Sequence, residues 1–341
     1  ISKKNWINVV LFDVTLLERE NRMNTVRPAF PTVLDSTLIA TFRSCPQKFY
    51  REYLQHYKPR AESVHLVAGG AFAKGLEMAR KAFFVEGRSP TDAQAIGMQA
   101  LMSAYGSFEC PPDSAKSCER MLGALEYYFD QYPLETDSAI PITLPSGARG
   151  IEFSFAEPID ATHPETGDPL IYCGRMDAVV NFAEGVFGLD DKTTSSLGAS
   201  WSKQWDLRSQ FTGYTWAAER AGFPMQGFLV RGISILKTRY DTQQAVTYRP
   251  KWMLDRWYEQ LMLDIDRMKK CWEAGYWDYN LDHACTEFGG CIFRQICLSQ
   301  DPQPWLDAGF TKRIWNPLLR TEETVGEAPL KVDLPETGAI L

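Results

Sequence analysis

Two carboxylates and one amine fall on strand-like segments in the middle of the chain. In residues 186–192, the alternation of a strand places Asp190 and Lys192 on one face and Asp191 on the other. Asp177 stands in an otherwise apolar strand, where an unpaired interior carboxylate costs free energy. Carboxylate oxygens from adjacent strands can hold Mg²⁺ or Mn²⁺, and a nearby ammonium can stabilise negative charge on a phosphate. These side chains predict a metal-dependent site for phosphate chemistry; a strand edge or a salt bridge is the alternative.

The elements that must position these residues alternate between helix and strand. Apolar residues at helical spacing predict a helix of about five turns from Asp35, and further helices at residues 70–85, 91–105, 114–132, 205–221 and 251–273. Period-two alternation predicts strands at residues 151–155, 171–180, 186–190, 227–236 and 244–248. A short turn at Glu184-Gly185 makes the first three strands a meander. The stretch beyond Pro302 is expected to be irregular.

A second chemical site is indicated by cysteines. Cys285, Cys291 and Cys297 are each separated by five residues, and Cys45, which precedes a proline, can supply a fourth thiolate. Four thiolates suit an iron-sulfur cluster or Zn²⁺, and His283 adjoins the group; ordinary reduced cysteines are the third alternative. The remaining cysteines are expected to be buried small hydrophobes, namely Cys110, Cys118, Cys173 and Cys271.

The bulk properties fit a packed globular protein of 341 residues, of which 45% are apolar. The net charge of -7 requires that any phosphate-binding surface be a local basic groove. No stretch reaches the roughly 18 apolar residues of a membrane span, so we expect a cytoplasmic protein with no membrane partner. Candidates for the basic groove are Arg43, Lys48, Arg51, Lys203, Arg208, Lys237 and Arg239.

The order of the central motifs resembles the RecB-like branch of the PD-(D/E)XK nuclease superfamily. Asp177 is followed by Asp190-Asp191-Lys192 and then by Gln210 and Tyr214 on one helix, and residues 44–50 and 70–77 resemble the earlier motifs. The resemblance covers most of residues 36–298 and implies an α/β fold. That fold has a restriction-endonuclease-like core, in which helices flank a central mixed sheet, with a helical N-terminal part. It also implies that Asp177 and Asp190 are metal ligands, that Lys192 is the catalytic lysine, and that Gln210 and Tyr214 serve the active site or the DNA backbone.

The first motif departs from this pattern, because Ala73 occupies the place where the branch usually has a histidine ligand. Glu77, one turn later on the same helix face, could bind the metal instead. Fewer protein ligands or lost activity are the alternatives. Glu152 resembles a glutamate that supports the site in related proteins, and a surface or salt-bridged role is the alternative for both glutamates.

The one-plus-three arrangement of Cys45 with the three late cysteines resembles the iron-sulfur nucleases of the AddB and CRISPR-adaptation type. In those proteins a [4Fe-4S] cluster clamps the two ends of the nuclease domain; they often have two residues between the second and third cysteine, where this chain has five. The expected divisions are an N-terminal arm (1–34), a helical region (35–135), the nuclease core (136–280), the cysteine cluster (281–300) and a tail (301–341).

The function implied by the resemblance is a Mg²⁺- or Mn²⁺-dependent deoxyribonuclease. We expect an exonuclease or end-processing enzyme that acts on single strands or DNA ends in replication, repair or recombination, with a helicase or recombination protein as a further partner. A bacteriophage origin fits compact members of this kind. The alternative is a catalytically silent member of the same fold that binds DNA or a protein partner.

Overall fold

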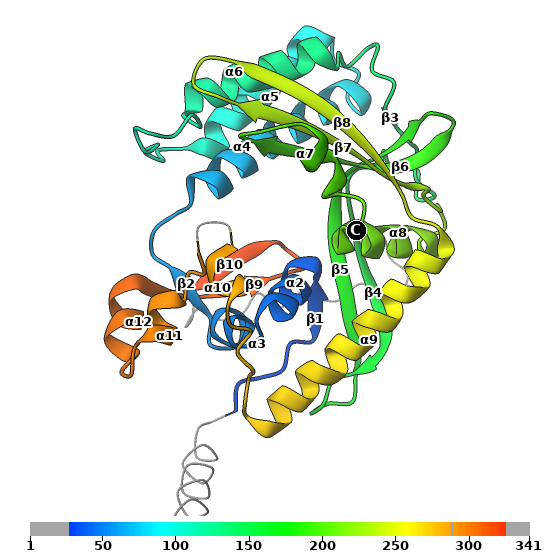
Figure 1. The fold of residues 1–341 in the computed structure, drawn as a ribbon. Coiled ribbons are helices and arrows are strands. Elements are labelled where there is room, and N and C mark those ends of the chain that lie inside the picture. Colours follow the sequence, from blue (N-terminus) through cyan, green and yellow to red (C-terminus); the bar gives the residue numbers. More distant parts are fainter. Residues whose placement is uncertain (1–26, 288–289, 325–341) are drawn as a thin grey trace, which may run out of the picture. The chain divides into compact units, whose positions relative to one another are not determined.

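The computed structural model describes residues 27–287 and 290–324 and divides the chain into two compact units (Figure 1). One unit holds the described residues up to Pro59, the segment Ile159–Ile171 and the residues from Leu261 on; the other holds Arg60–Pro158 and Tyr172–Gln260. Within residues 27–287 and 290–324, no helix has both the length and the apolar character of a membrane span. The N-terminal arm predicted for residues 1–34 falls mostly outside the described residues.

The larger unit is built on a mixed sheet. Strand β5 (Pro169–Phe182) pairs antiparallel with β6 (Gly185–Thr194), which pairs parallel with β7 (Gly227–Ile235), and β7 pairs antiparallel with β8 (Tyr240–Tyr248). Strands β3 (Ile140–Pro141) and β4 (Ile151–Thr162) pair with β5, so β4, β5 and β6 form the predicted meander. The β5–β6 turn uses left-handed backbone at Ala183 (φ 46°) and Glu184 (φ 62°), the geometry that matches the twist of a two-residue hairpin.

Helices cover both faces of this sheet. On one face, α4 (Val64–Phe84), α5 (Pro90–Tyr105) and α6 (Cys118–Gln131) share an apolar core with Ile233 and Ile235 of β7 (Figure 1). Residues of opposite parity on a strand point to opposite faces. Phe228 accordingly stacks on Phe211 of α8 (Ser209–Arg220), with ring centroids 4.3 Å apart. The short α7 (Ala199–Lys203) precedes α8, and α9 (Lys251–Ala274) follows the sheet, so the predicted alternation of helices and strands is confirmed.

The N-terminal helix of the other unit differs from the prediction. Asp35 caps α2 (Ser36–Ser44) by accepting hydrogen bonds of 2.8 Å from the backbone of Thr37 and Leu38. The prediction of a single helix of about five turns from Asp35 was wrong, because the backbone is extended at Cys45, between α2 and α3 (Pro46–Phe49). The ring of a proline disfavours helical backbone at the preceding residue, and this places Cys45 in the break. A π-helical turn, η1 (Tyr50–Leu54), follows α3.

The C-terminal part of this unit is also more regular than predicted. It contains α10 (His283–Thr286), α11 (Arg294–Leu298), α12 (Gln303–Gly309), β9 (Phe310–Asn316) and β10 (Thr321–Thr324). Strand β9 lies between β10 and β2 (Tyr57–Pro59), and Phe310 stacks on Phe293 at 5.0 Å. The expectation of an irregular tail beyond Pro302 was therefore wrong for residues 303–324, where β9 pairs with the distant β2, and its remainder lies outside the described residues. Strand β1 (Val33–Asp35) lies near the start of β5, where the Ile171 amide donates to the Thr32 carbonyl.

Candidate active site

The centre of the site is a close ion pair on β6. The Lys192 Nζ lies 2.5 Å from the Asp190 Oδ2, so the two side chains share one face of the strand. That oxygen is buried and accepts no well-aligned hydrogen bond from the described residues. The pKa of Asp190 is raised to about 6, because burial and the charge of Asp177 together outweigh the opposing effect of Lys192. Burial lowers the pKa of Lys192, but Asp190 and Asp177 together bring it above its ordinary value.

Asp177 lies on β5 directly before Ala178, the residue that pairs with Leu189 of β6 in the sheet. Its Oδ2 accepts a 3.0 Å hydrogen bond from the backbone N–H of Asp191, which ties this carboxylate to β6. The negative charge of Asp177 also raises the pKa of Asp190 and of Glu152. Adjacent strands thus bring the two predicted aspartates and Lys192 within electrostatic range of one another.

Glu152 adopts a backbone conformation that is uncommon for glutamate, with φ at 55°. Its carboxylate forms an ion pair of 2.8 Å with the Arg175 Nε. The pKa of Glu152 is raised to about 7, because burial and the charges of Asp177 and Glu77 together outweigh the opposing effect of Arg175. Strained backbone that supports a buried acid is most often found at functional sites.

Glu77 comes to the same cluster from α4. Lys74 and Lys81, which lie three residues before and four after it, place their ammonium groups 2.9 Å and 2.8 Å from its carboxylate. Burial acts to raise the pKa of Glu77, but the two lysines bring it below the ordinary value. Four acidic side chains from α4, β4, β5 and β6 therefore interact electrostatically, namely Glu77, Glu152, Asp177 and Asp190.

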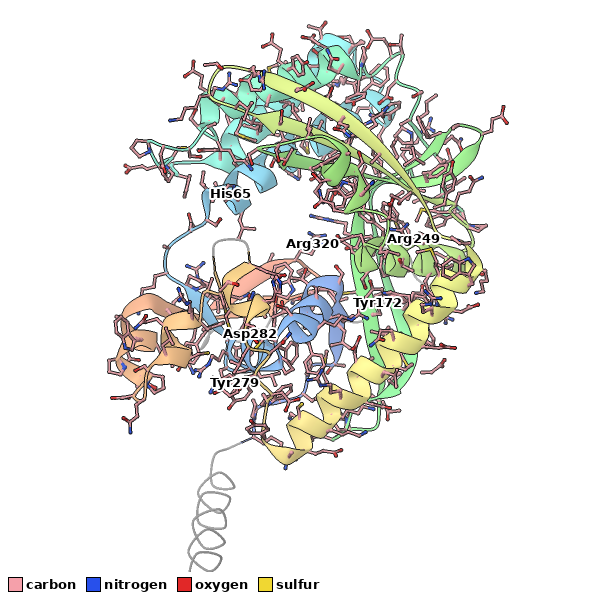
Figure 2. All side chains as sticks on the ribbon, in the orientation of Figure 1. His65, Tyr172, Arg249, Tyr279, Asp282 and Arg320 are labelled. Atoms are coloured by element: carbon pink, nitrogen blue, oxygen red, sulfur yellow. The ribbon has the colours of Figure 1, made fainter. Side chains whose placement is uncertain are left out.

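The helix α8 contributes Gln210 and Tyr214. The Gln210 Nε2 donates a 3.1 Å hydrogen bond to the Tyr214 hydroxyl, and the charge of that hydroxyl affects the pKa of Lys192. The Tyr214 ring itself is buried and contacts Phe155 edge-on, with centroids 5.3 Å apart. The residue therefore combines core packing with a hydroxyl at the site. Arg249, labelled in Figure 2, holds the start of α8 through a 3.0 Å bond to the Thr212 hydroxyl.

The donor set fits a divalent cation. Four carboxylates supply only oxygen ligands, the type that Mg²⁺ and Mn²⁺ prefer, and a bound cation would relieve the repulsion that raises the pKa of Glu152 and Asp190. As placed, however, no three His, Cys, Asp or Glu side chains within the described residues are arranged to hold a metal ion. Basic side chains instead neutralise the carboxylates one by one, with Lys192 on Asp190 and Arg175 on Glu152.

A comparison with models of protein families identifies the family of this chain. The family model of the PD-(D/E)XK nuclease superfamily matches residues 36–298, which is more than half of the chain. The chain belongs to the PD-(D/E)XK nuclease superfamily. The mixed sheet flanked by helices agrees with the restriction-endonuclease-like fold expected for this superfamily.

Two solved structures show distant similarity to this nuclease-superfamily chain. One is a protein from Eubacterium rectale that is provisionally named an exonuclease, with 10% identity, coverage of 84% of this chain and 93% of that one, and a TM-score of 0.43. The other is the protein SSO0001, with 12% identity, coverage of 76% and 88%, and a TM-score of 0.26. A search of curated protein sequences gives no significant match.

The opposite face of β6 carries a charge network that the sequence did not reveal. Asp191 accepts hydrogen bonds of 2.6 Å from both Arg80 of α4 and Tyr128 of α6. Arg231 of β7 donates to the Tyr128 hydroxyl and forms a bidentate pair with Asp137, with both N–O distances 2.6 Å. Burial favours the neutral acid, yet Arg80 and Tyr128 bring the pKa of Asp191 below its ordinary value. The signal in the sequence was the parity of Asp191, which directs it away from Asp190.

A polar cavity of about 390 Å³ lies at the carboxyl ends of the parallel strands β6 and β7. Gln243 fixes one wall, because its amide accepts from the Gly198 N–H at 2.7 Å and donates to the Gly198 carbonyl at 3.2 Å. The cavity begins three residues beyond Lys192, where carboxyl ends of parallel strands commonly bind ligands. Its lining residues are Ser195, Ser196, Leu197, Gly198, Ser234, Leu236, Arg239, Asp241 and Gln243.

The basic residues proposed for a groove have different surroundings. Arg43 forms an ion pair with Asp264 at 2.6 Å, and Lys48 and Arg51 line a pocket with the cysteines described below. Arg43 is therefore not free, and the place of these three residues in a basic groove stays a prediction. The exposed candidates are all in the unit that carries the nuclease site, namely Lys203, Arg208, Lys237 and Arg239.

The four cysteines singled out from the sequence line a single pocket, and all four are free thiols. The segment after α9 is tied to the break in the first helix, because the Asn280 side chain donates to the Ser44 carbonyl at 2.6 Å and the Gln47 amide donates to the Asp278 carbonyl at 2.9 Å. Figure 2 labels Tyr279, which lies between these contacts and lines the pocket. The thiols that line it are Cys45, Cys285, Cys291 and Cys297.

The late cysteines approach each other through a tight loop. The Cys291 amide donates to the Cys285 carbonyl at 3.0 Å, and Gly290 takes a φ of 106° that suits glycine. Burial raises the pKa of the Cys291 and Cys297 thiols, and each is raised further by Cys45 and Cys285.

His283 and the other four cysteines differ in how exposed they are to solvent. His283 is not among the pocket residues and its side chain is 93% exposed. Cys173 and Cys271 are buried as predicted, whereas Cys110 and Cys118 are only partly buried, so that expectation was wrong for those two.

Proposed function

We propose that this protein is a Mg²⁺- or Mn²⁺-dependent deoxyribonuclease, an exonuclease or end-processing enzyme that acts on single strands or DNA ends. The observation that carries the proposal is the 2.5 Å pair between Lys192 and the buried Asp190, with Asp177 beside it on the next strand. Membership in a nuclease superfamily supports the same reaction class. Replication, repair or recombination is the proposed setting, with a helicase or recombination protein as partner.

Each charged residue of the site has its own role in the proposed reaction. Asp177 and Asp190 would hold the cation, with Glu77 as a third ligand in the place of the absent histidine. When bound, the cation lowers the pKa of water and screens the charge of the phosphate. Lys192 donates a hydrogen bond to a phosphate oxygen and stabilises the negative charge that grows as water oxygen bonds to phosphorus and the bond to the leaving nucleotide oxygen breaks.

Other side chains position the DNA strand. The Gln210 and Tyr214 pair, fixed by its internal 3.1 Å hydrogen bond, presents polar groups to the strand near Lys192. The cavity beyond β6 offers serine hydroxyls and the exposed Arg239, groups that bind phosphate oxygens. We therefore assign the nucleotide next to the cleaved bond to this cavity. Glu152 supports the site through its pair with Arg175.

The test is cleavage of 5′- and 3′-labelled single and double strands with Mg²⁺, Mn²⁺ or EDTA. Wild type is expected to cleave the strands with Mg²⁺ or Mn²⁺ but not with EDTA. The Lys192→Ala variant is expected to lose this activity. Lys251→Ala, an exposed lysine of α9 in the same unit that forms surface ion pairs, is the matched control and is expected to retain activity. A Lys192→Ala variant that cuts single-stranded DNA with Mn²⁺ as fast as wild type would make the assignment wrong.

A catalytically silent DNA-binding protein is the second candidate. Two features favour it: Ala73 stands where the histidine ligand is usual, and Glu77 is already paired with two lysines. For this candidate, labelled DNA should bind without being cut under every divalent metal tested. Binding and cleavage assays on the same substrate separate the two functions.

For the cysteine pocket we propose a [4Fe-4S] cluster with a structural role, with Zn²⁺ as the alternative. Four thiols lining one pocket supply the donor type of either centre, although as placed no three of them among the described residues surround a common ion position. The basic lining residues Lys48 and Arg51 suit an anionic thiolate complex. Cys291→Ser is expected to lose absorbance near 400 nm and to unfold at a lower temperature, whereas Cys110→Ser should retain both. A folded wild type that is colourless and metal-free after purification without air would exclude both centres.

A further inference from the structure

A buried arginine lies among the four cysteines. Arg51 is only 9% exposed and lines the same pocket as Cys45 and Cys297. Its Nε is buried, and within the described residues it has no hydrogen-bond partner. A buried charged group normally has a full set of partners, so an unpaired guanidinium nitrogen beside the thiols calls for a ligand.

Arg51 lies in a π-helical turn. The Gln55 amide donates to the Tyr50 carbonyl five residues earlier at 2.8 Å, so this turn holds one residue more than an α-helical turn. Lys48 of α3 and Arg51 of η1 are three residues apart, a spacing that places side chains on one helix face, and both line the pocket. Isolated π turns are frequent at functional sites.

Among the described residues, the charged side chains that line the pocket are all basic, namely Lys48, Arg51 and Arg294, and none of the described lining residues is a carboxylate. Of these three, Arg294 is exposed to solvent, whereas Arg51 is buried. Thiolates that ligate a metal centre bring negative charge into the pocket, and hydrogen bonds to the sulfurs stabilise it. The buried guanidinium is therefore the group best placed to compensate that charge.

We propose that Arg51 is the buried counter-charge of the cysteine-bound cluster and that its Nε–H donates a hydrogen bond to a cysteine or sulfide sulfur. This inference rests on the [4Fe-4S] centre proposed above and assigns a positioning residue to it. A positive charge beside the cluster stabilises the reduced form, which carries one more negative charge. Arg51 therefore raises the reduction potential of the cluster as well as its retention in the protein.

The experiment compares Arg51→Gln with wild type as full chains purified without air. Iron per chain, absorbance near 400 nm, the rate of iron loss to a chelator and the midpoint potential are measured. Arg51→Gln is expected to lose iron about tenfold faster, the size of effect typical of groups that support metal ligands, and to have a more negative potential. Arg313→Gln, an exposed arginine of β9 that does not line the pocket, is the matched control and should match wild type.

The outcomes separate this inference from the cluster itself. Wild type without iron and sulfide overturns the cluster and with it the role of Arg51. Iron-loaded wild type together with an Arg51→Gln variant of equal potential and equal iron loss overturns the role of Arg51 alone. If Arg51→Gln does not fold, Arg51→Lys decides: it keeps the charge without the guanidinium, so intermediate iron retention supports the proposal and wild-type values of both quantities contradict it.

Discussion

The two faces of β6 carry neighbouring aspartates with opposite surroundings. Asp191 accepts two 2.6 Å hydrogen bonds, from Arg80 and Tyr128, and its pKa lies below the ordinary value. Asp190 is buried equally well, but its close neighbours include another carboxylate, and its pKa is raised to about 6. A saturated carboxylate holds the fold together, whereas a buried carboxylate with too few donors is where a cation or a substrate can bind. The difference arises because adjacent residues of a strand point to opposite faces of the sheet.

Among substitutions that test the difference between Asp190 and Asp191, Asp190→Asn is expected to have the largest effect. Since the amide is isosteric but cannot ligate as an anion, DNA cleavage should fall by about 10³-fold, the range seen when one charge-stabilising group is removed. Urea unfolding in EDTA should change less than for Asp191→Asn, because Lys192 is partly exposed to solvent and keeps Asp177 as a second negative neighbour. A large loss of stability with activity retained would reverse the roles assigned to the two faces.

The opposite result is expected for Asp191→Asn. Breaking a buried ion pair by removing one partner leaves Arg80 without its counter-charge, which typically costs about 3–5 kcal/mol of unfolding free energy. The double substitution Arg80→Met with Asp191→Leu removes both charges and should recover much of that loss. Urea unfolding of the single and double variants measures both, and equal destabilisation of the two would contradict a charge-pair origin.

A smaller, pH-dependent effect is expected for Glu152→Gln. Folding raises the pKa of Glu152 to about 7, so the folded wild type keeps a proton that the unfolded chain loses near pH 4.5. Wild type therefore loses stability as the pH rises from 4.5 to 7, and the uncharged glutamine does not. In EDTA the variant should gain about 1–3 kcal/mol relative to wild type between pH 4 and pH 8. The exposed Glu86→Gln serves as control, and a pH-independent difference for Glu152→Gln would contradict the repulsion.

Local patterns in the sequence predicted much of the fold and the centre of the site. Period-two and helical spacing predicted the strands and helices of the sheet unit, and strand parity predicted that Asp190 and Lys192 share a face. The roles of these residues stay predictions until the variants are assayed.

What the sequence did not predict depends on contacts between distant segments. Arg80 of α4 and Tyr128 of α6 donate to Asp191, and Arg231 of β7 donates to the Tyr128 hydroxyl. No local sequence pattern indicates these contacts. The strand β9 is likewise fixed by pairing with β2, far away in the chain. The break of the first helix at Cys45 could have been predicted from Pro46, but the apolar periodicity continued across it and favoured one long helix.

The hydrogen bonds that join residues 44–47 to residues 278–280 have a consequence for biosynthesis. Cys45 leaves the ribosome long before the three thiols with which it shares a pocket, so no centre that needs all four can assemble until nearly the whole chain has been made. Loading of the proposed centre would thus be a late step in maturation, which a chain truncated before Cys297 could not complete.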